Sequence, residues 1–194
     1  MGLPGLGPRA EPSTRIRVTV TFLRMDHPPA AAGPALPSDT ALVRVTRPSV
    51  EFYRYLYATV GAPHAWWLRR TVPDEVLQTL LRDAGIAIHV LYRGGEPAGF
   101  FELDSRARPD VNLSYFGLVP HAVGTGLGTA FLRRAVDQAW ALAPRSLTVN
   151  TCTADHPRAM PAYLRAGFVP IRSVAEVWDV PKRLGLMLPA HLLV

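Results

Sequence analysis

The sequence predicts an α/β (α+β) fold in which helices flank a mixed, mainly antiparallel central sheet. Three observations support this prediction. First, three runs rich in β-branched and aromatic residues follow one another between residues 86 and 118, as in an antiparallel meander. Second, residues 127–140 carry apolar side chains at three- and four-residue spacing, which indicates an amphipathic helix. Third, the apolar run Ser146–Cys152 follows that helix, so it would lie parallel to the last strand of the meander.

The N-terminal part of the chain adds one strand to this sheet. Residues 1–13 are rich in Gly and Pro and are expected to be disordered, so residues 14–194 would form a single domain. Arg15–Met25 alternates apolar and polar residues, which is typical of a half-buried strand. We expect this extra strand to lie at an edge of the sheet or to pair with another subunit. His27–Asp39, rich in Pro and Ala, is expected to be a flexible connection.

The next segment predicts a strand and two helices. Ala41–Thr46 reads as the first core strand, and Ser49 can cap the helix that follows, to about Thr59. A short linker then leads to a second helix at Pro73–Asp83.

The meander itself consists of three strands. Ile86–Tyr92 and Pro97–Leu103 are separated by a glycine turn and form a hairpin. After a loop at residues 104–110, Val111–Leu118 completes the antiparallel set.

The composition narrows the class of function. The chain has 194 residues, a formal charge of +6 and 21 basic residues, of which only Lys182 is a lysine. The arginines are scattered, so the sequence favours a solvated basic surface over a nucleic-acid tract. The same net charge would attract a highly anionic ligand.

Cysteine and histidine usage points to a cytoplasmic protein without a metal. Cys152 is the only cysteine, which rules out an intrachain disulfide and fits a reducing compartment. Its place in a buried strand favours a core residue over a nucleophile. We find no membrane span and no signal-peptide pattern, so no membrane contact is expected. The six histidines show no metal-ligand spacing.

A glycine loop between the Val111–Leu118 strand and the helix at residues 127–140 is the first candidate site. The loop reads Gly124-Thr125-Gly126-Leu127-Gly128. Glycine lets the backbone approach a ligand closely, and a helix start presents unpaired N–H groups, which together suit a diphosphate. No Lys-Ser/Thr follows, so it is not a P-loop, and G-x-G-x-G late in the chain is not a dinucleotide fingerprint. An ordinary tight turn is the alternative interpretation.

A second pattern lies downstream of the loop. Residues 157–166 read as a short helix, with Asp155 or His156 as its preferred cap. The helix and its end contain four residues at characteristic spacing, Ala159, Tyr163, Gly167 and Phe168. With the glycine loop, this pattern resembles the GNAT superfamily of N-acetyltransferases over roughly residues 42–177.

The resemblance implies an acetyl-CoA-dependent N-acetyltransferase. It would transfer an acetyl group to a primary amine by direct attack in a ternary complex. A small-molecule amine is the favoured acceptor; a protein N-terminus or lysine is the alternative, and a non-catalytic acyl-CoA-binding module is a third possibility. The extra strand and the apolar tail Leu184–Val194 are compatible with a homodimer, and no nucleic-acid partner is expected.

The resemblance also assigns the coenzyme A site. The loop amides would hold the diphosphate, the pantetheine arm would lie between the strands ending at Leu118 and Cys152, and a backbone N–H near Leu118 or Val119 would hold the thioester carbonyl. Val123 stands where the family usually has Arg or Gln, and His156 stands where it usually has Asn. The predicted cofactor residues are Gly117, Leu118, Val119, Val123, Gly124, Thr125, Gly126, Leu127, Gly128, Thr129 and His156.

The acceptor pocket is expected beside the two helices of residues 49–83, which in this family form one of its walls. Their aromatic density suits an apolar or aromatic amine, although most such rings belong to cores. The predicted substrate-binding residues are Tyr57, Trp66, Trp67, His89 and Tyr115.

Two residues are the candidates for proton transfer. The resemblance makes Tyr163 the acid that protonates the leaving thiolate. Glu102 lies in an otherwise apolar strand, where desolvation would raise its pKa toward neutrality and make it a general base. His89 and Tyr115 are competing bases or pocket residues.

Overall fold

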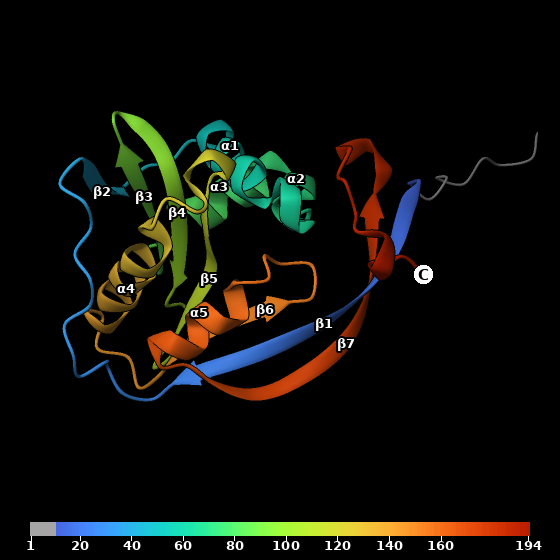
Figure 1. The fold of residues 1–194 in the computed structure, drawn as a ribbon. Helices are drawn as coiled ribbons and strands as arrows, with labels where there is room; N and C mark the ends of the chain where they lie inside the picture. The colour runs from blue at the N-terminus through green and yellow to red at the C-terminus, as the bar shows by residue number, and fades with distance from the viewer. Residues whose placement is uncertain (1–10) are drawn as a thin grey trace, which may run out of the picture.

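The computed structural model describes residues 11–194, which form one seven-stranded sheet with helices on both faces (Figure 1). The strand order is β2-β3-β4-β5-β6-β1-β7, and β5 runs parallel to β6 while the other neighbours pair antiparallel. The predicted fold class is confirmed. The elements are β1 (Ser13–Met25), β2 (Thr40–Val45), α1 (Val50–Gly61), α2 (Leu68–Thr71), α3 (Asp74–Arg82), β3 (Ile86–Arg93), β4 (Glu96–Asp104), β5 (Val111–Leu118), α4 (Leu127–Trp140), β6 (Leu147–Cys152), α5 (Ala159–Ala166) and β7 (Val169–Pro181).

The two faces of the sheet are covered by different helices. Neighbouring residues of β4 point to opposite faces, as the pleat of a strand requires. Phe100 packs against Tyr53 of α1, with ring centroids 6.1 Å apart, whereas Phe101 packs against Phe131 of α4 at 5.6 Å. The core therefore consists of two apolar layers, one on each side of the sheet.

The N-terminal strand does not lie where the sequence predicted. β1 is an interior strand that pairs with β6 on one side and with β7 on the other, so the expected edge position and the expected pairing with another subunit are both wrong. In Figure 1, β1 and β7 form a long curved ribbon. Alternation along one strand reveals its buried face but not the distant segment that pairs with it.

The divergence of β5 and β6 is the feature of the sheet that matters for function. Their parallel pairing is limited to Val111–Leu113 against Leu147–Val149. Beyond these residues, β5 continues along β4 and β6 continues along β1. The two strands therefore separate toward their C-terminal ends.

Several local predictions can be compared with the structure. The Ser49 cap is confirmed, because its hydroxyl accepts a hydrogen bond from the Phe52 amide at 3.2 Å. The short helix α2 was not predicted.

The segment expected to be disordered lies outside the described residues except for residues 11–13, and Ser13 already begins β1. The C-terminal tail packs on its own chain, with Leu193 bridged to Ile16. Among residues 11–194, no helix is long and apolar enough to cross a membrane.

We propose that residues 14–194 unfold as one domain, and Ile16 provides the test. Its side chain projects from β1 into an apolar cluster and is 0% exposed. Ile16→Ala should lower the free energy of unfolding by about 2–5 kcal/mol, because it leaves a cavity in a packed cluster. Val177→Ala on the exposed face of the ribbon is the control and should change it by no more than about 0.5 kcal/mol. Urea unfolding followed by circular dichroism measures both. Two separate transitions, or an equal effect of the two variants, would contradict the proposal.

Candidate active site

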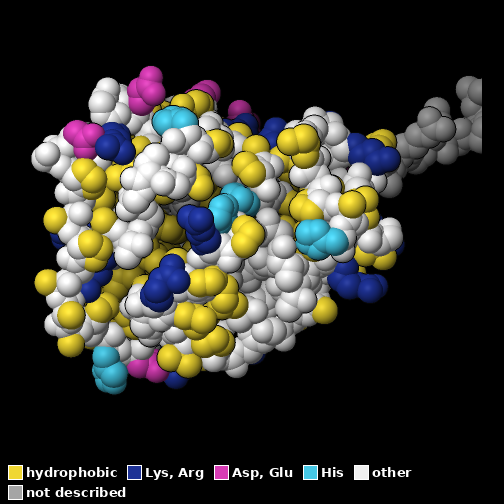
Figure 2. All heavy atoms as spheres, in the orientation of Figure 1, with side chains coloured by type: hydrophobic (Ala, Val, Ile, Leu, Met, Phe, Trp, Pro, Cys, Tyr) yellow, Lys and Arg dark blue, Asp and Glu magenta, His cyan; other side chains and the backbone are white. Residues whose placement is uncertain are grey.

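A cavity of about 430 Å³ lies where β5 and β6 diverge. The glycine loop borders it on one side and α5 on the other, and the loop between α1 and α2 closes its far end. Figure 2 shows basic and histidine side chains next to one another near the middle of the face drawn there.

The glycine loop has the backbone conformation that its sequence suggested. Gly124 and Gly126 have φ values of 84° and 85°, in the left-handed region that favours glycine. The Thr125 hydroxyl donates to the Ala122 carbonyl at 2.8 Å, which fixes the start of the loop. In the described part of the chain, no backbone carbonyl accepts from the amides of residues 124–128. The loop and the first turn of α4 therefore leave a group of N–H donors beside the cavity, an arrangement that suits an anion.

Positive charge reaches this cavity from α5 and not from the loop. Val123 is 41% exposed and brings no charge. Arg158 and Arg165 line the cavity from the opposite wall. Within residues 11–194, neither guanidinium forms an ion pair with a carboxylate. The sequence did not single out these arginines, because only the fold brings α5 opposite the glycine loop.

The predicted cofactor residues divide into two groups. Most line the cavity, whereas Val119, Thr125 and Leu127 do not. The Val119 amide also donates to the Ala98 carbonyl at 3.0 Å, so its hydrogen is already engaged. Of the two predicted donors to a carbonyl, this leaves Leu118 as the available candidate. The cavity-lining members of the predicted set are Gly117, Leu118, Val123, Gly124, Gly126, Gly128, Thr129 and His156.

The predicted acceptor residues are only partly brought together. Trp66 and Tyr115 line the cavity, and Tyr57 packs behind them with ring centroids 5.3 and 4.9 Å away. Trp67 instead packs against the apolar cluster under β1. His89 is buried and stacks on Phe101 at 4.6 Å, which places it on the α4 face, away from the cavity.

Tyr163 lies in the wall of the cavity. It is buried on α5, and its ring packs against Phe168 at 5.8 Å and near Phe116 at 6.5 Å. Burial, aided by the charge of Asp155, raises the pKa of its phenol above the ordinary value. The group is therefore protonated at neutral pH and can donate a proton to a base within the cavity.

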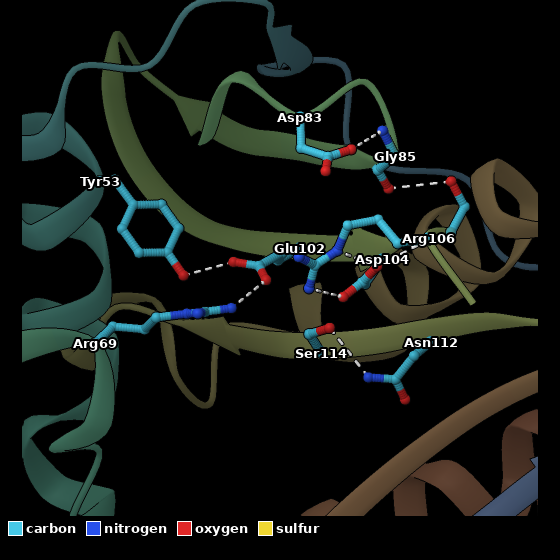
Figure 3. Close-up of polar contacts among 10 residues, drawn as sticks. Tyr53, Arg69, Asp83, Gly85, Glu102, Asp104, Arg106, Asn112 and Ser114 are labelled. Carbon is cyan, nitrogen blue, oxygen red and sulfur yellow. Dashed lines mark hydrogen bonds and ion pairs between the residues drawn. The ribbon is translucent and has the colours of Figure 1, made fainter. Parts of the chain in front are cut away.

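Glu102 is enclosed beside the cavity and does not line it. Figure 3 shows its carboxylate between Tyr53 and Arg69, each of which donates to one of its oxygens, with an Arg69 Nη2 to Oε1 distance of 2.9 Å. The Glu102 side chain is 0% exposed. Burial raises the pKa of Glu102, while Arg69 and the Tyr53 hydrogen bond oppose this. The Arg69 guanidinium lies over the Tyr115 ring, 5.4 Å from its centroid. Sequence reasoning missed Tyr53 and Arg69 as partners of Glu102.

Asp155 connects the two loops at the far end of the cavity. Its Oδ1 accepts from Trp66 Nε1 at 3.3 Å, and its Oδ2 accepts from the Thr151 hydroxyl at 2.7 Å and the Cys152 amide at 2.9 Å. The predicted cap of the helix by Asp155 or His156 is wrong, because Arg158 is the N-cap of α5 and no side chain caps it. The Asp155 oxygens are bound at the end of β6, and His156 Nδ1 accepts from the Arg158 amide at 3.1 Å, just before the helix.

The remaining candidate ligands and nucleophiles contribute little. Cys152 lines the cavity, but burial raises the pKa of its thiol to about 12, which keeps it protonated at neutral pH. Nowhere in residues 11–194 do three or more His, Cys, Asp or Glu side chains gather in a way that could hold a metal ion.

Comparisons with known proteins agree with this geometry. The family model described as Acetyltransferase (GNAT) family matches residues 48–168. A GCN5-related N-acetyltransferase from Kribbella flavida is 18% identical, with a TM-score of 0.58 over 87% of this chain and 60% of that one. One from Sphaerobacter thermophilus is 15% identical, with a TM-score of 0.58 over 87% and 53%.

A shorter protein also has this fold. An aminoglycoside acetyltransferase from an uncultured soil metagenomic sample, solved in complex with trehalose, is 14% identical, with a TM-score of 0.52 over 66% of this chain and 88% of that one. The chain thus spans less than two thirds of the Kribbella and Sphaerobacter proteins. No curated protein matches the sequence. At these identities the solved structures show the fold alone.

The buried ion pair yields a prediction on stability. The folded-state pKa of Glu102 is raised above its unfolded value of about 4.3. The free energy of unfolding therefore falls as the pH rises from the unfolded-state pKa to the folded-state pKa of this carboxyl group. Arg69 lowers that pKa, so Arg69→Met should raise it further. We expect Arg69→Met to lower the free energy of unfolding by about 3–5 kcal/mol at pH 8, where Glu102 is left charged and unpaired. The decrease should be smaller at pH 5.

Urea unfolding at the two pH values measures this difference. The double variant Arg69→Met/Glu102→Gln is the control, and it should lose the extra pH dependence because no buried charge remains. An equal loss at both pH values in the single variant would show that Arg69 stabilises the fold through packing and not through Glu102.

Proposed function

Since this chain belongs to the acetyltransferase (GNAT) family, we propose that it transfers an acetyl group from acetyl-CoA to a primary amine of a small molecule. Both substrates would be bound together, and the amine would attack the thioester directly. The observation that carries the proposal is the cavity between β5 and β6, with free loop amides at one end and aromatic side chains at the other.

The residues around the cavity fit coenzyme A. The amides of residues 124–128 suit its diphosphate, and Arg158 and Arg165 supply positive charge that Val123 lacks. The facing edges of β5 and β6 offer backbone groups to the amides of the pantetheine arm, because the two strands do not pair there. Acetyl-CoA supplies the acetyl group as an activated thioester.

The chemical roles follow from position. The Leu118 amide is the proposed donor to the thioester carbonyl, where a fixed N–H stabilises developing negative charge. Tyr163, protonated in the cavity wall, is the proposed acid for the leaving thiolate. Glu102 was predicted as the base, but its enclosure between Tyr53 and Arg69 favours a positioning role for it.

A small amine is favoured as acceptor because the far end of the cavity is aromatic. Trp66 and Tyr115 line it and suit an apolar or aromatic amine. The aminoglycoside acetyltransferase that shares the fold also acts on a small molecule. A panel of 2-phenylethylamine, tryptamine, kanamycin and a lysine-containing peptide, assayed by thiol release from acetyl-CoA, tests the proposal. Turnover of the peptide alone would favour the protein-acetylating alternative, and binding of acetyl-CoA without turnover would favour the acyl-CoA-binding module.

Gly128→Glu tests the diphosphate site. Gly128 has no left-handed backbone, and a Cβ there would meet only Leu118 Cδ1, at 3.9 Å, so the variant introduces a charge without strain. We expect the Kd for acetyl-CoA to rise by about tenfold or more, because a repulsion of about 1.4 kcal/mol between the new carboxylate and a phosphate already gives a tenfold change. Gly128→Gln is the matched neutral control. Calorimetric titration measures both, and equal weakening would mean that the effect is steric.

Arg158 and Arg165 provide an independent test of where the phosphates lie. Loss of a charged hydrogen bond costs about 1.5–3 kcal/mol, so each Arg→Ala variant should raise the KM for acetyl-CoA by about tenfold or more. The KM for S-acetylpantetheine, which lacks phosphate groups, should not change. Arg82→Ala, at an exposed position of α3, is the control. An equal rise of the KM for acetyl-CoA and for S-acetylpantetheine would show that these arginines do not contact the phosphates.

A further inference from the structure

His64 is one of two histidines that line the cavity near Trp66, at the end where the acceptor amine is proposed to bind (the acceptor end). It follows α1, and its half-buried ring lines the cavity together with Trp66. Its ring centroid lies 5.9 Å from that of His156, which enters from the opposite loop. The sequence placed His64 in a linker and gave it no role.

The backbone around His64 is held in an unusual conformation. Ala65 has φ 55°, a left-handed conformation that is uncommon for a residue with a side chain, and it is buried in the cluster beneath β1. The chain reverses there, so His64 and Trp66, which flank Ala65, both line the cavity. Trp66 is tied in turn to Asp155 by its indole N–H. This arrangement fixes His64 relative to the end of β6, as a catalytic group requires.

The two carboxylates near the cavity are both occupied. Glu102 is fully buried between Tyr53 and Arg69, and Asp155 accepts hydrogen bonds from three donors. His64, by contrast, lines the cavity beside the proposed acceptor residues Trp66 and Tyr115. We propose that His64 is the general base that removes the proton from the acceptor amine, and this inference rests on the proposed function.

The charge state of His64 agrees with this role. Burial lowers its pKa and His156 adds to this change, whereas Asp155 and a hydrogen bond to the Ala154 backbone oppose it; the pKa stays below its ordinary value, so the neutral imidazole can accept a proton at pH 7. His156 differs, because its Nδ1 already accepts the Arg158 amide hydrogen, so that nitrogen is not available to an acceptor amine. The His64 ring has one nitrogen engaged with the Ala154 backbone, and its other nitrogen can accept a proton.

The reaction balances with these groups. The amine nitrogen attacks the thioester carbonyl carbon, an N–C bond forms and the C–S bond breaks. The amine proton passes to His64, and the departing thiolate takes the phenolic proton of Tyr163. The imidazolium then returns a proton to the tyrosinate through solvent, which restores both groups.

The test is the pH dependence of kcat for acetyl transfer to 2-phenylethylamine, or to another panel amine that is turned over. In the wild type, kcat should rise with pH through a pKa below the ordinary histidine value of about 6.5. His64→Gln should lower kcat by about 100-fold or more and abolish this rise, because general base catalysis typically contributes about 10² to 10⁴. His64→Ala with added imidazole should recover part of the rate.

The controls separate His64 from its neighbours. Glu102→Gln should keep the rise of kcat with pH, whatever its effect on the rate, and His156→Asn should raise the KM for acetyl-CoA and keep the rise as well. His27→Gln, an exposed histidine away from the cavity, should match the wild type. Retention of the rise by His64→Gln, or its loss in Glu102→Gln alone, would overturn the proposal. Absence of thiol release with every panel amine would overturn the proposed function and this inference with it.

A readout that needs no turnover accompanies the kinetics. The imidazole C–H signal of His64, assigned by its absence from the His64→Gln spectrum, should shift when coenzyme A is added, because His64 lines the cavity. It should also titrate below pH 6.5 in the free protein. A signal unmoved by coenzyme A, in a sample whose glycine-loop signals do move, would place His64 outside the reacting region and overturn the proposal.

Discussion

The limited pairing of β5 and β6 is the constraint on which the rest of this structure depends. The strands share register only from Val111 to Leu113 on β5 and then diverge. Strands that diverge leave N–H and C=O groups unpaired on their facing edges, which costs free energy unless water or a ligand takes them. Each strand is held from its other side, β5 by β4 and β6 by β1. The cavity can therefore exist before any ligand binds, because neither strand needs the other to stay in the sheet.

The N-terminal strand also supports this cavity, because it positions the two loops at the acceptor end. β1 pairs with both β6 and β7, and its inward side chains Ile16, Val18 and Val20 form an apolar cluster separate from the main core. Ala65 and Ala154 belong to that cluster, and they are the neighbours of His64 and Asp155 in the chain. Packing beneath the ribbon thus positions the two loops that close the acceptor end. A segment that looks peripheral in the sequence contributes to the geometry of the site.

The sequence predicted the elements better than their arrangement. Helix and strand positions follow from local spacing, and the Ser49 cap and the glycines at 124 and 126 follow from local backbone chemistry, so these features could be read directly. Two adjacent tryptophans gave no local sign of which one lines the cavity, and the structure places Trp66 there and Trp67 under β1. His89 and Glu102 were chosen from apolar strands, where sequence cannot distinguish an enclosed polar side chain from one that faces a ligand. The partners of Glu102 come from α1 and α2, far from it in the chain.

The distribution of carboxylates around the cavity limits its chemistry. Glu102 neutralises Arg69, whose guanidinium covers the ring of Tyr115, so this carboxylate shapes the acceptor wall through another residue. Asp155 joins Trp66 to the end of β6, so its oxygens are committed to holding the loops. Glu102 is enclosed and does not line the cavity, and Asp155 already accepts three hydrogen bonds, so neither presents a free oxygen to an incoming amine. An amine that enters this cavity therefore meets histidine as the available acceptor for its proton. Two arginines, Arg158 and Arg165, outnumber Asp155 among the charged side chains that line the cavity, which favours an anionic acetyl donor.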